Sequence, residues 1–475
     1  MIKFSLSLIG LIFIGLQTGF SQTDIRFELE GYEESYMAIA NNLLDNQYIV
    51  DTIYTNDEGQ FVYQPEEAMP PGIYLAVIAP NNEFFQFLVT DEEQAFTIST
   101  KVGELVDAAE IEGSRENQLF YDYLSYLSDA GKQNRELNEE LADSTISQAR
   151  RMEIDQQLQA LDGQVKDHQQ SLLEAHPDSY LAVIIKGNEG ANPPEFTEIE
   201  DDQKRGLKRL YWMREHFFDN LDLKDPRLLR TPFLFQKVDF FVNRLHSRAP
   251  DTLVQAIDQV LSKMDTESET FKFYLIHYLN EAANSEFVGM DAIYVHLIDK
   301  YYANGMAPWT DAEQLGKFLD NANRLRPLLV GKIAPDIRMK RRDGTEISLH
   351  EVESPYTVLY FWRYDCGHCK ESTPFMKEFY DKWKTMGVEL FAVCAKTAEE
   401  VGECWEYIDE HDIGSWLHTI DPYLQSRYAV LYDLQTTPQI YVLDENKEIL
   451  SKRIGAEQLD ELMGLILEER ANEGR

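Results

Sequence analysis

Cysteine is absent from the first three quarters of this 475-residue sequence. The chain has four cysteines, Cys366, Cys369, Cys394 and Cys404, so residues 1–365 cannot hold a disulfide framework of their own. Positive charge is also scarce, because 44 Lys and Arg stand against 83 Asp and Glu and give a formal net charge of −39. A surface this acidic repels phosphate backbones, which excludes nucleic acid as a partner.

Long hydrophobic runs are missing beyond the N-terminus. Lys3 is followed by an uncharged, mostly apolar stretch over 4–16 and then by the small residues Gly19 and Ser21. This pattern is typical of a secretory signal peptide and predicts that residues 1–21 are removed. The stretch is too short to cross the ~30 Å hydrocarbon core as an anchor. We therefore expect an exported, periplasmic chain that is not an integral membrane protein after cleavage.

The hydrophobic pattern predicts three domains, which agrees with a length of about 150 residues per domain. Residues 22–114 alternate with a period of two between turn signals, which predicts an antiparallel β-sandwich-like domain. Within it, we expect 48–54 and 61–63 to form a hairpin around Gly59.

Residues 115–328 have helical spacing and predict an all-helical domain, in which the sequence indicates no chemistry. From residue 329 to 475 the order becomes strand, helix, strand, helix, hairpin and helix, which predicts an α/β domain on a mixed sheet. The whole chain is thus expected to be a multidomain α+β protein.

The motif that can carry chemistry is Cys366-Gly367-His368-Cys369, which follows a buried strand ending at Trp362. A lone C-x-x-C can be half of a zinc site, but zinc would need two further ligands, and none is suitably spaced. As a redox pair, Cys366 lies at a helix N-terminus, where the helix dipole favours a thiolate. Cys369 lies one turn further on and can resolve a mixed disulfide. His368 would also stabilise the thiolate.

Several motifs together resemble the thioredoxin superfamily over about 329–475. They are the segment 331–336 (GKIAPD), Phe361-Trp362, the C-G-H-C motif, Pro374 and Thr437-Pro438. The opening segment and the exported context resemble the TlpA/ResA-like thiol-disulfide oxidoreductases. The upstream layout is similar to exported bacterial proteins with β-rich and helical domains of unassigned function.

This resemblance implies a thioredoxin-like fold and a role for each matching residue. Cys366 would attack, Cys369 would resolve, and Pro438 would be a cis-proline that, with Thr437 and Trp362, receives the substrate backbone by strand addition. No metal or organic cofactor would be needed beyond the Cys366–Cys369 disulfide. The partners would be protein thiols or disulfides and a redox partner protein.

Three positions depart from the family pattern. Asp365 stands where a tryptophan usually precedes the first cysteine, and its carboxylate would raise the pKa of Cys366. Tyr360 occupies the place of a buried polar or acidic residue. Ser372 occupies the place of a glutamate, which leaves the adjacent Glu371 as a candidate proton acceptor for Cys369.

The two remaining cysteines, Cys394 and Cys404, are interpreted as buried, unpaired thiols. A second disulfide, or a relay to the C-G-H-C pair, is the alternative interpretation, because spacing alone does not place the two residues within the ~7 Å that a bridge requires.

The sequence therefore predicts an exported thiol-disulfide oxidoreductase. Two alternatives stay open. In the first, the upstream domains bind a partner and the thioredoxin module is only a scaffold. The second is a thiol peroxidase related to alkyl hydroperoxide reductases, although no Ser or Thr is placed to polarise a peroxide.

Overall fold

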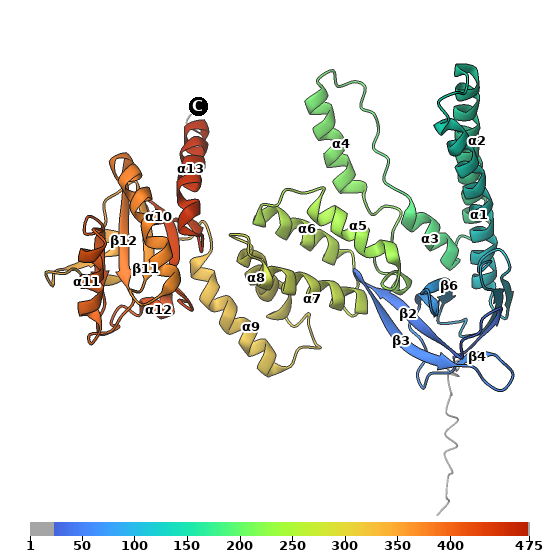
Figure 1. Cartoon of the computed structure of the whole chain (residues 1–475), viewed down its shortest axis with the longest axis horizontal. Helices are drawn as coiled ribbons and strands as arrows, with labels where there is room; N and C mark the ends of the chain where they lie inside the picture. The colour runs from blue at the N-terminus through green and yellow to red at the C-terminus, as the bar shows by residue number, and fades with distance from the viewer. Residues whose placement is uncertain (1–22, 474–475) are drawn as a thin grey trace, which may run out of the picture. The chain divides into compact units, whose positions relative to one another are not determined.

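A computed structural model of the protein describes residues 23–473 (Figure 1), so the predicted signal peptide lies outside the described residues. The described chain divides into two compact units. The first runs to Leu245 and includes Lys263–Thr270, and the second consists of His246–Ser262 and the chain from Phe271 onward. None of the helices between residues 23 and 473 is long and apolar enough to cross a membrane.

The first unit begins with two four-stranded sheets, ordered β4-β1-β7-β8 and β3-β2-β5-β6. Their strands are β1 (Asp24–Glu30), β2 (Tyr36–Leu43), β3 (Asn46–Tyr54), β4 (Phe61–Tyr63), β5 (Gly72–Ile78), β6 (Glu83–Val89), β7 (Ala95–Lys101) and β8 (Glu110–Glu112). All pairs are antiparallel except β1 with β7. The Phe27 ring contacts the rings of Phe85 and Phe87, at centroid distances of 5.6 and 5.3 Å, so the two sheets share a core.

The predicted hairpin between 48–54 and 61–63 is wrong. Strand β3 pairs with β2, and β4 pairs with β1 in the other sheet. Only one bridge, Thr55 to Phe61, joins the two segments. Phe61 and Tyr63 of β4 are buried beside β1, and the burial of these two aromatic side chains favours pairing with β1 over pairing with β3.

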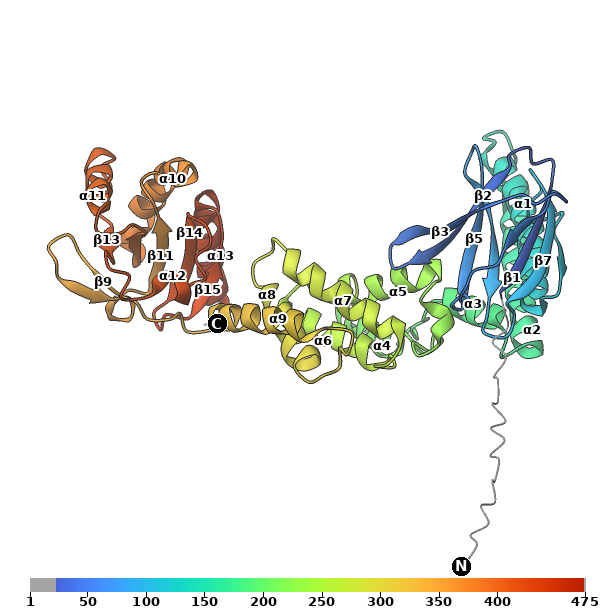
Figure 2. The same cartoon turned by 90° about the horizontal axis from the view of Figure 1, so that it is seen from below.

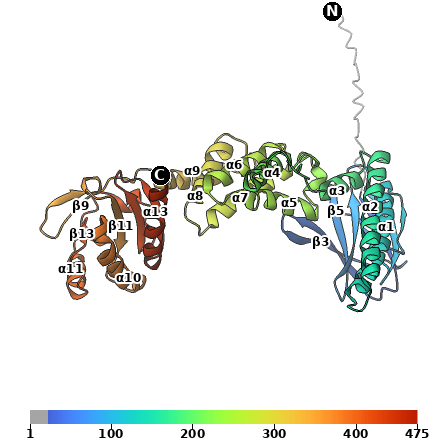
Figure 3. The same cartoon turned by 90° about the horizontal axis from the view of Figure 1, so that it is seen from above.

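Helices follow the sheets in the first unit: α1 (Arg115–Ala142), α2 (Gln148–Ala175), α3 (Tyr180–Asn188), α4 (Asp202–His216) and α5 (Pro232–Asn243). Figure 3 shows α1 and α2 side by side, and Arg150 of α2 donates to Glu140 of α1 at 2.6 and 2.7 Å. The two helices are therefore an antiparallel hairpin.

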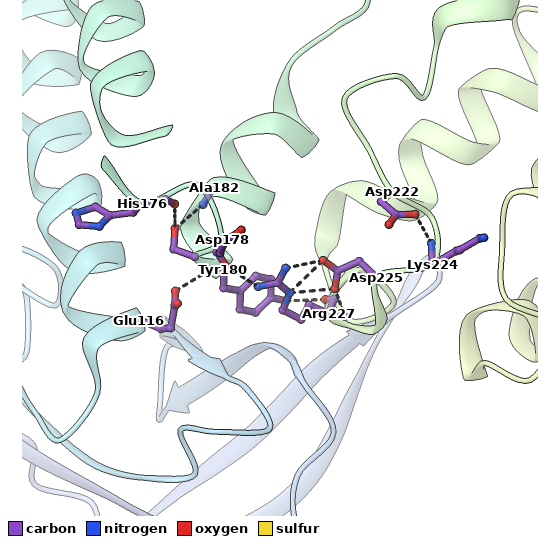
Figure 4. Close-up of polar contacts among 10 residues, drawn as sticks. Glu116, His176, Asp178, Tyr180, Ala182, Asp222, Lys224, Asp225 and Arg227 are labelled. Carbon is purple, nitrogen blue, oxygen red and sulfur yellow. Dashed lines mark hydrogen bonds and ion pairs between the residues drawn. The ribbon is translucent and has the colours of Figure 1, made fainter. Parts of the chain in front are cut away.

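Polar contacts tie these helices to the β-rich part. The Asn117 side chain bonds both the N–H and the carbonyl of Leu88, at 2.7 and 2.8 Å. Glu116 accepts a hydrogen bond from the backbone N–H of Tyr180 (2.8 Å), whose hydroxyl donates to the carbonyl of Arg227 (2.6 Å; Figure 4). Burial raises the pKa of the Glu116 carboxyl, and the nearby carboxylate of Glu93 raises it further, although the Tyr180 N–H opposes this shift.

The second unit joins helices to the C-terminal sheet. Its first helices are α6 (Pro250–Ser262), α7 (Glu269–Asn284, which begins in the first unit), α8 (Asp291–Leu297) and α9 (Ala312–Leu325). Lys452 on the sheet has a side chain that is only 5% exposed. Its ammonium pairs with Asp291 of α8 and donates to the carbonyl of Leu328 at 2.5 Å.

The C-terminal domain has a seven-stranded mixed sheet in the order β10-β9-β13-β12-β11-β14-β15 (Figure 2). The strands are β9 (Arg338–Lys340), β10 (Glu346–Ser348), β11 (Tyr356–Trp362), β12 (Val388–Cys394), β13 (Leu417–Ile420), β14 (Gln439–Asp444) and β15 (Ile449–Lys452). The helices are α10 (Gly367–Trp383), α11 (Val401–Glu410), α12 (Tyr428–Leu431) and α13 (Leu459–Glu473).

Strand β11 is an interior strand of this sheet, between β12 and β14, and is buried at every position, as its apolar run predicts. It runs parallel to β12 and antiparallel to β14. Side chains of α10, α11 and α13 form the core on one face, and α12 packs on the other. The predicted architecture of β sheets, central helices and a thioredoxin-like α/β domain is confirmed.

Candidate active site

The cysteine pair lies where strand β11 passes into a helix. Strand β11 ends at Trp362, and after three residues Cys366 forms the N-cap of α10 with an extended backbone. Its sulfur accepts a hydrogen bond from the backbone N–H of Cys369 at 3.3 Å. The sulfur therefore takes the place of the oxygen that usually caps a helix, and it faces the positive end of the helix dipole.

Burial separates the two thiols chemically. Cys366 is partly exposed, whereas Cys369 is 1% exposed, and both are free cysteines. Desolvation opposes ionisation of Cys366, but the hydrogen bonds from the thiol and the N–H of Cys369 outweigh it and lower the pKa of Cys366. Burial raises the pKa of Cys369 to about 12, with a further contribution from Cys366. One thiol is thus suited to attack as a thiolate and the other stays protonated.

Thr437 and Pro438 close the site from the opposite side. The peptide bond between them is cis. The Cys366 thiol approaches the carbonyl oxygen of Thr437 at 3.2 Å, although the two residues are 71 positions apart in the chain. The segment leads directly into β14, beside β11, so the sequence-predicted pair is brought next to the reactive sulfur.

His368 and Glu371 lie on the exposed face of α10. The His368 ring pairs with the Glu371 carboxylate at 3.3 Å, and both side chains are largely exposed. Among the hydrogen bonds of residues 23–473, none joins a carboxylate to the Cys369 thiol. The Thr373 hydroxyl donates to the backbone carbonyl of Cys369 at 2.9 Å, and the buried Tyr360 is close enough for the two residues to influence each other electrostatically.

Tyr360 and Trp362 are both buried on β11. In the described part of the chain, the Tyr360 hydroxyl and the Trp362 indole nitrogen have no hydrogen-bond partner. Burial raises the pKa of Tyr360 well above its ordinary value, and the neighbouring Cys369 acts in the same direction. Tyr360 therefore remains a neutral hydroxyl beside the cysteines.

Asp365 does not face Cys366 as an isolated charge. Its carboxylate is bound by the Arg363 guanidinium at 3.1 and 2.9 Å and by the Lys396 ammonium at 2.8 Å. The Arg363 hydrogen bond lowers the pKa of Asp365 to about 2, with Lys396 adding to it against the desolvation cost. Sequence reasoning found Asp365 but missed Lys396, whose only signal was its position just after a buried strand.

Cys394 and Cys404 form a disulfide, and the expectation that they are unpaired is wrong. Their Cα atoms are 6.5 Å apart, within bridging range. The bond joins the end of β12 to α11, and both residues are buried in the core that also holds Cys369. The reason for the error is tertiary: α11 folds back over β12, which a ten-residue spacing in sequence does not reveal.

Residues 23–473 contain no group of three or more His, Cys, Asp or Glu that could hold a metal ion. The described site presents two free thiols, Cys366 and Cys369. Paired thiols of unequal acidity, at the carboxyl end of a buried strand that runs parallel to its neighbour, are the reactive centre of a thioredoxin-fold thiol-disulfide oxidoreductase, and the C-terminal domain is of this class.

Comparisons with known proteins agree with this class. Residues 330–452 match the AhpC/TSA family, whereas 24–120 and 190–324 match two domains of unknown function, DUF4369 and DUF5106. The thiol-disulfide oxidoreductase ResA of Oceanobacillus iheyensis is 30% identical over 141 residues, which is 29% of this chain and 71% of that protein. The ResA of Bacillus cereus strain ZK / E33L is 26% identical over 137 residues, 29% of this chain and 76% of that protein.

Among solved structures, a domain of a possible thiol-disulfide isomerase from Cytophaga hutchinsonii is 36% identical. The match covers 31% of this chain and 99% of that domain, with a TM-score of 0.29. The chain belongs to the ResA-like thiol-disulfide oxidoreductases, to which it adds domains upstream.

Proposed function

We propose that the protein is an exported, periplasmic oxidoreductase that exchanges disulfides with protein substrates through Cys366 and Cys369. The observation that carries this proposal is the geometry of the pair: the partly exposed Cys366 sulfur caps α10 and accepts the Cys369 N–H at 3.3 Å, whereas Cys369 is buried. The apolar N-terminal segment supports export, and it lies outside the described residues.

In the reductive direction, the Cys366 thiolate attacks one sulfur of a substrate disulfide. A Cys366–substrate disulfide forms, and the second substrate sulfur leaves as a thiolate and takes up a proton. Cys369 then loses its proton and attacks the Cys366 sulfur, which releases the first substrate thiol and leaves a Cys366–Cys369 disulfide. The substrate gains two electrons and the enzyme loses two, which a redox partner protein restores. Oxidation of a substrate dithiol is the same sequence in reverse.

The cis segment at Thr437-Pro438 supports a position for the substrate. Its carbonyl lies 3.2 Å from the attacking sulfur, so an extended substrate strand paired there would bring its disulfide to Cys366. Trp362 belongs to the same buried core as Cys369, and Asp365 and His368 are the chain neighbours of the pair. Because the Asp365 charge is balanced by Arg363 and Lys396, the sequence-based reason for a raised Cys366 pKa is weakened.

The test is reduction of insulin by the mature protein, by Cys366→Ser and by Cys369→Ser. We expect Cys366→Ser to be inactive and Cys369→Ser to accumulate a mixed disulfide. Equal rates for wild type and Cys366→Ser would refute the enzymatic proposal and favour the adaptor function. The AhpC/TSA match makes peroxide a useful second substrate, and consumption of peroxide without insulin reduction would favour the peroxidase.

The direction of electron flow follows from the reduction potential in glutathione buffers, read from Trp362 fluorescence. A transition near roughly −180 mV would indicate an oxidant or isomerase, and one near or below roughly −270 mV a reductase.

A further inference from the structure

Four charged side chains form a cluster at the loop that leads from β11 into Cys366, two from the loop itself and two from the segment after β12. Arg363 and Lys396 are cationic, and Asp365 and Glu400 are anionic, so the cluster carries no net charge. Asp365 binds both cations, and the Lys396 ammonium also binds Glu400 at 2.6 Å. The charge of Asp365, the residue directly before Cys366, is thus balanced by neighbouring cations.

Lys396 is the most buried member of this cluster, with a side chain that is 6% exposed. It follows β12, and the preceding residue, Ala395, donates its N–H to the carbonyl of Trp362 at 2.8 Å. The Lys396 ammonium lies 4.9 Å from the centre of the Tyr364 ring. One side chain therefore contacts two consecutive residues of the loop, Tyr364 and Asp365.

The elements that hold Lys396 are themselves joined covalently. Cys394 lies two residues before Lys396, and Cys404 lies on α11, four residues after Glu400. The disulfide between them fixes the end of β12 to α11, and hence Lys396 to its partner Glu400. The ammonium is thus held at a fixed place against the loop.

Burying an ammonium is costly unless anions surround it, and here Asp365 and Glu400 supply the two anions. Without Lys396, Asp365 would keep one cation, and the cluster next to Cys366 would carry a net negative charge. A carboxylate beside a thiol disfavours the thiolate. The other charged pair near the site, His368 with Glu371, lies on the exposed face of α10, where solvent screens it.

We propose that Lys396 is a positioning residue for thiol-disulfide exchange, which neutralises Asp365 and braces the loop that leads into Cys366. The proposal rests on the proposed function of Cys366 as the attacking cysteine. Neutralisation by Lys396 would explain why this chain tolerates Asp365 directly before Cys366.

The test is the pH dependence of Cys366 alkylation by iodoacetamide in the full-length mature protein. We expect Lys396→Met to raise the pKa of Cys366 by roughly 0.5–1 unit, because the loop is partly exposed and solvent weakens the effect. Lys396→Arg should restore most of the wild-type value. Lys377→Met is the matched control. It removes a partly exposed lysine of α10 that pairs with Asp412, outside the charged cluster, and it should leave the pKa of Cys366 unchanged.

A double variant separates charge from structure. Asp365→Asn removes one negative charge and should lower the pKa of Cys366, and Asp365→Asn combined with Lys396→Met returns the cluster to zero net charge. We expect this double variant to have a pKa close to wild type. A pKa that stays as high as in Lys396→Met would overturn the electrostatic role.

The outcomes also separate this inference from the proposed function. If wild-type Cys366 alkylates with an ordinary thiol pKa and does not reduce insulin, the proposed function fails. If wild-type Cys366 is acidic and active but Lys396→Met behaves like Lys377→Met, only the role of Lys396 is refuted. Should Lys396→Met fail to fold, Lys396→Arg and Asp365→Asn decide alone: an unchanged pKa in Asp365→Asn would refute the role.

Discussion

The two thiols of the pair should differ in alkylation rate by more than an order of magnitude. The pKa of Cys366 lies below the ordinary 9.0 and that of Cys369 is about 12, so the two are at least about three units apart. Below pH ~8.5 this gives Cys366 at least a ~1,000-fold larger thiolate fraction. The more basic Cys369 thiolate is intrinsically the better nucleophile, and a Brønsted slope of about 0.5 recovers ~30-fold. We therefore expect at least a ~30-fold preference for Cys366, which burial of Cys369 increases.

The assay is brief alkylation of the reduced protein with iodoacetamide at pH 7, followed by mass spectrometry of the peptides. The label should be found on Cys366, and Cys369 should become reactive only after unfolding in urea. Unfolded protein is the control, because both thiols should then react at comparable rates. A native protein that labels Cys369 as fast as Cys366 would refute the assignment of attacking and resolving roles.

Three further predictions concern stability. Burial on α6 opposes ionisation of Asp258, but hydrogen bonds from His296, Lys300 and Tyr301 outweigh it and lower its pKa from 3.8 to about 2. Asp258→Asn should therefore cost about 2 kcal/mol of unfolding free energy in urea at pH 7. That contribution is present above pH ~4 and is lost as the pH falls toward 2, so a pH-independent cost would contradict it. Glu116→Ala should cost ~1 kcal/mol, because the N–H of Tyr180 loses its acceptor, and Glu116→Gln should cost less in the same urea assay. Replacing both Cys394 and Cys404 by alanine should lower the unfolding free energy by about 3 kcal/mol for a loop of this length. If the wild-type protein is equally stable with and without a reductant, a structural disulfide is contradicted.

The place of the cysteine pair in the fold was predictable because its signals are local. A buried apolar run, a C-x-x-C motif and a helical pattern occupy consecutive residues, and together they place Cys366 at a helix N-terminus. The cis-proline segment was also found, since Thr437-Pro438 directly precedes a buried strand. Both predictions depend on neighbours within a few positions of each other.

The partners of Asp365 could not be found in this way. Lys396 lies 31 positions from Asp365, and the contact exists only because β12 runs parallel to β11 and ends at the same edge of the sheet. The Cys394–Cys404 disulfide has the same origin, because it depends on how α11 returns over β12. In both cases the sequence identified residues of the right chemistry, and tertiary packing determined their partners.

The helices upstream of the redox domain are more than a spacer, because one buried ion pair crosses the predicted boundary at 328/329. Lys452 is on the edge strand β15, where a buried ammonium is unfavourable without a partner. Its partners, Asp291 and the carbonyl of Leu328, both come from the preceding helical segment. The redox domain therefore carries a charge that is satisfied only by residues outside the AhpC/TSA match. This is a physical reason to regard the last helices and the thioredoxin-like sheet as one structural unit, and to study the enzyme with those helices attached.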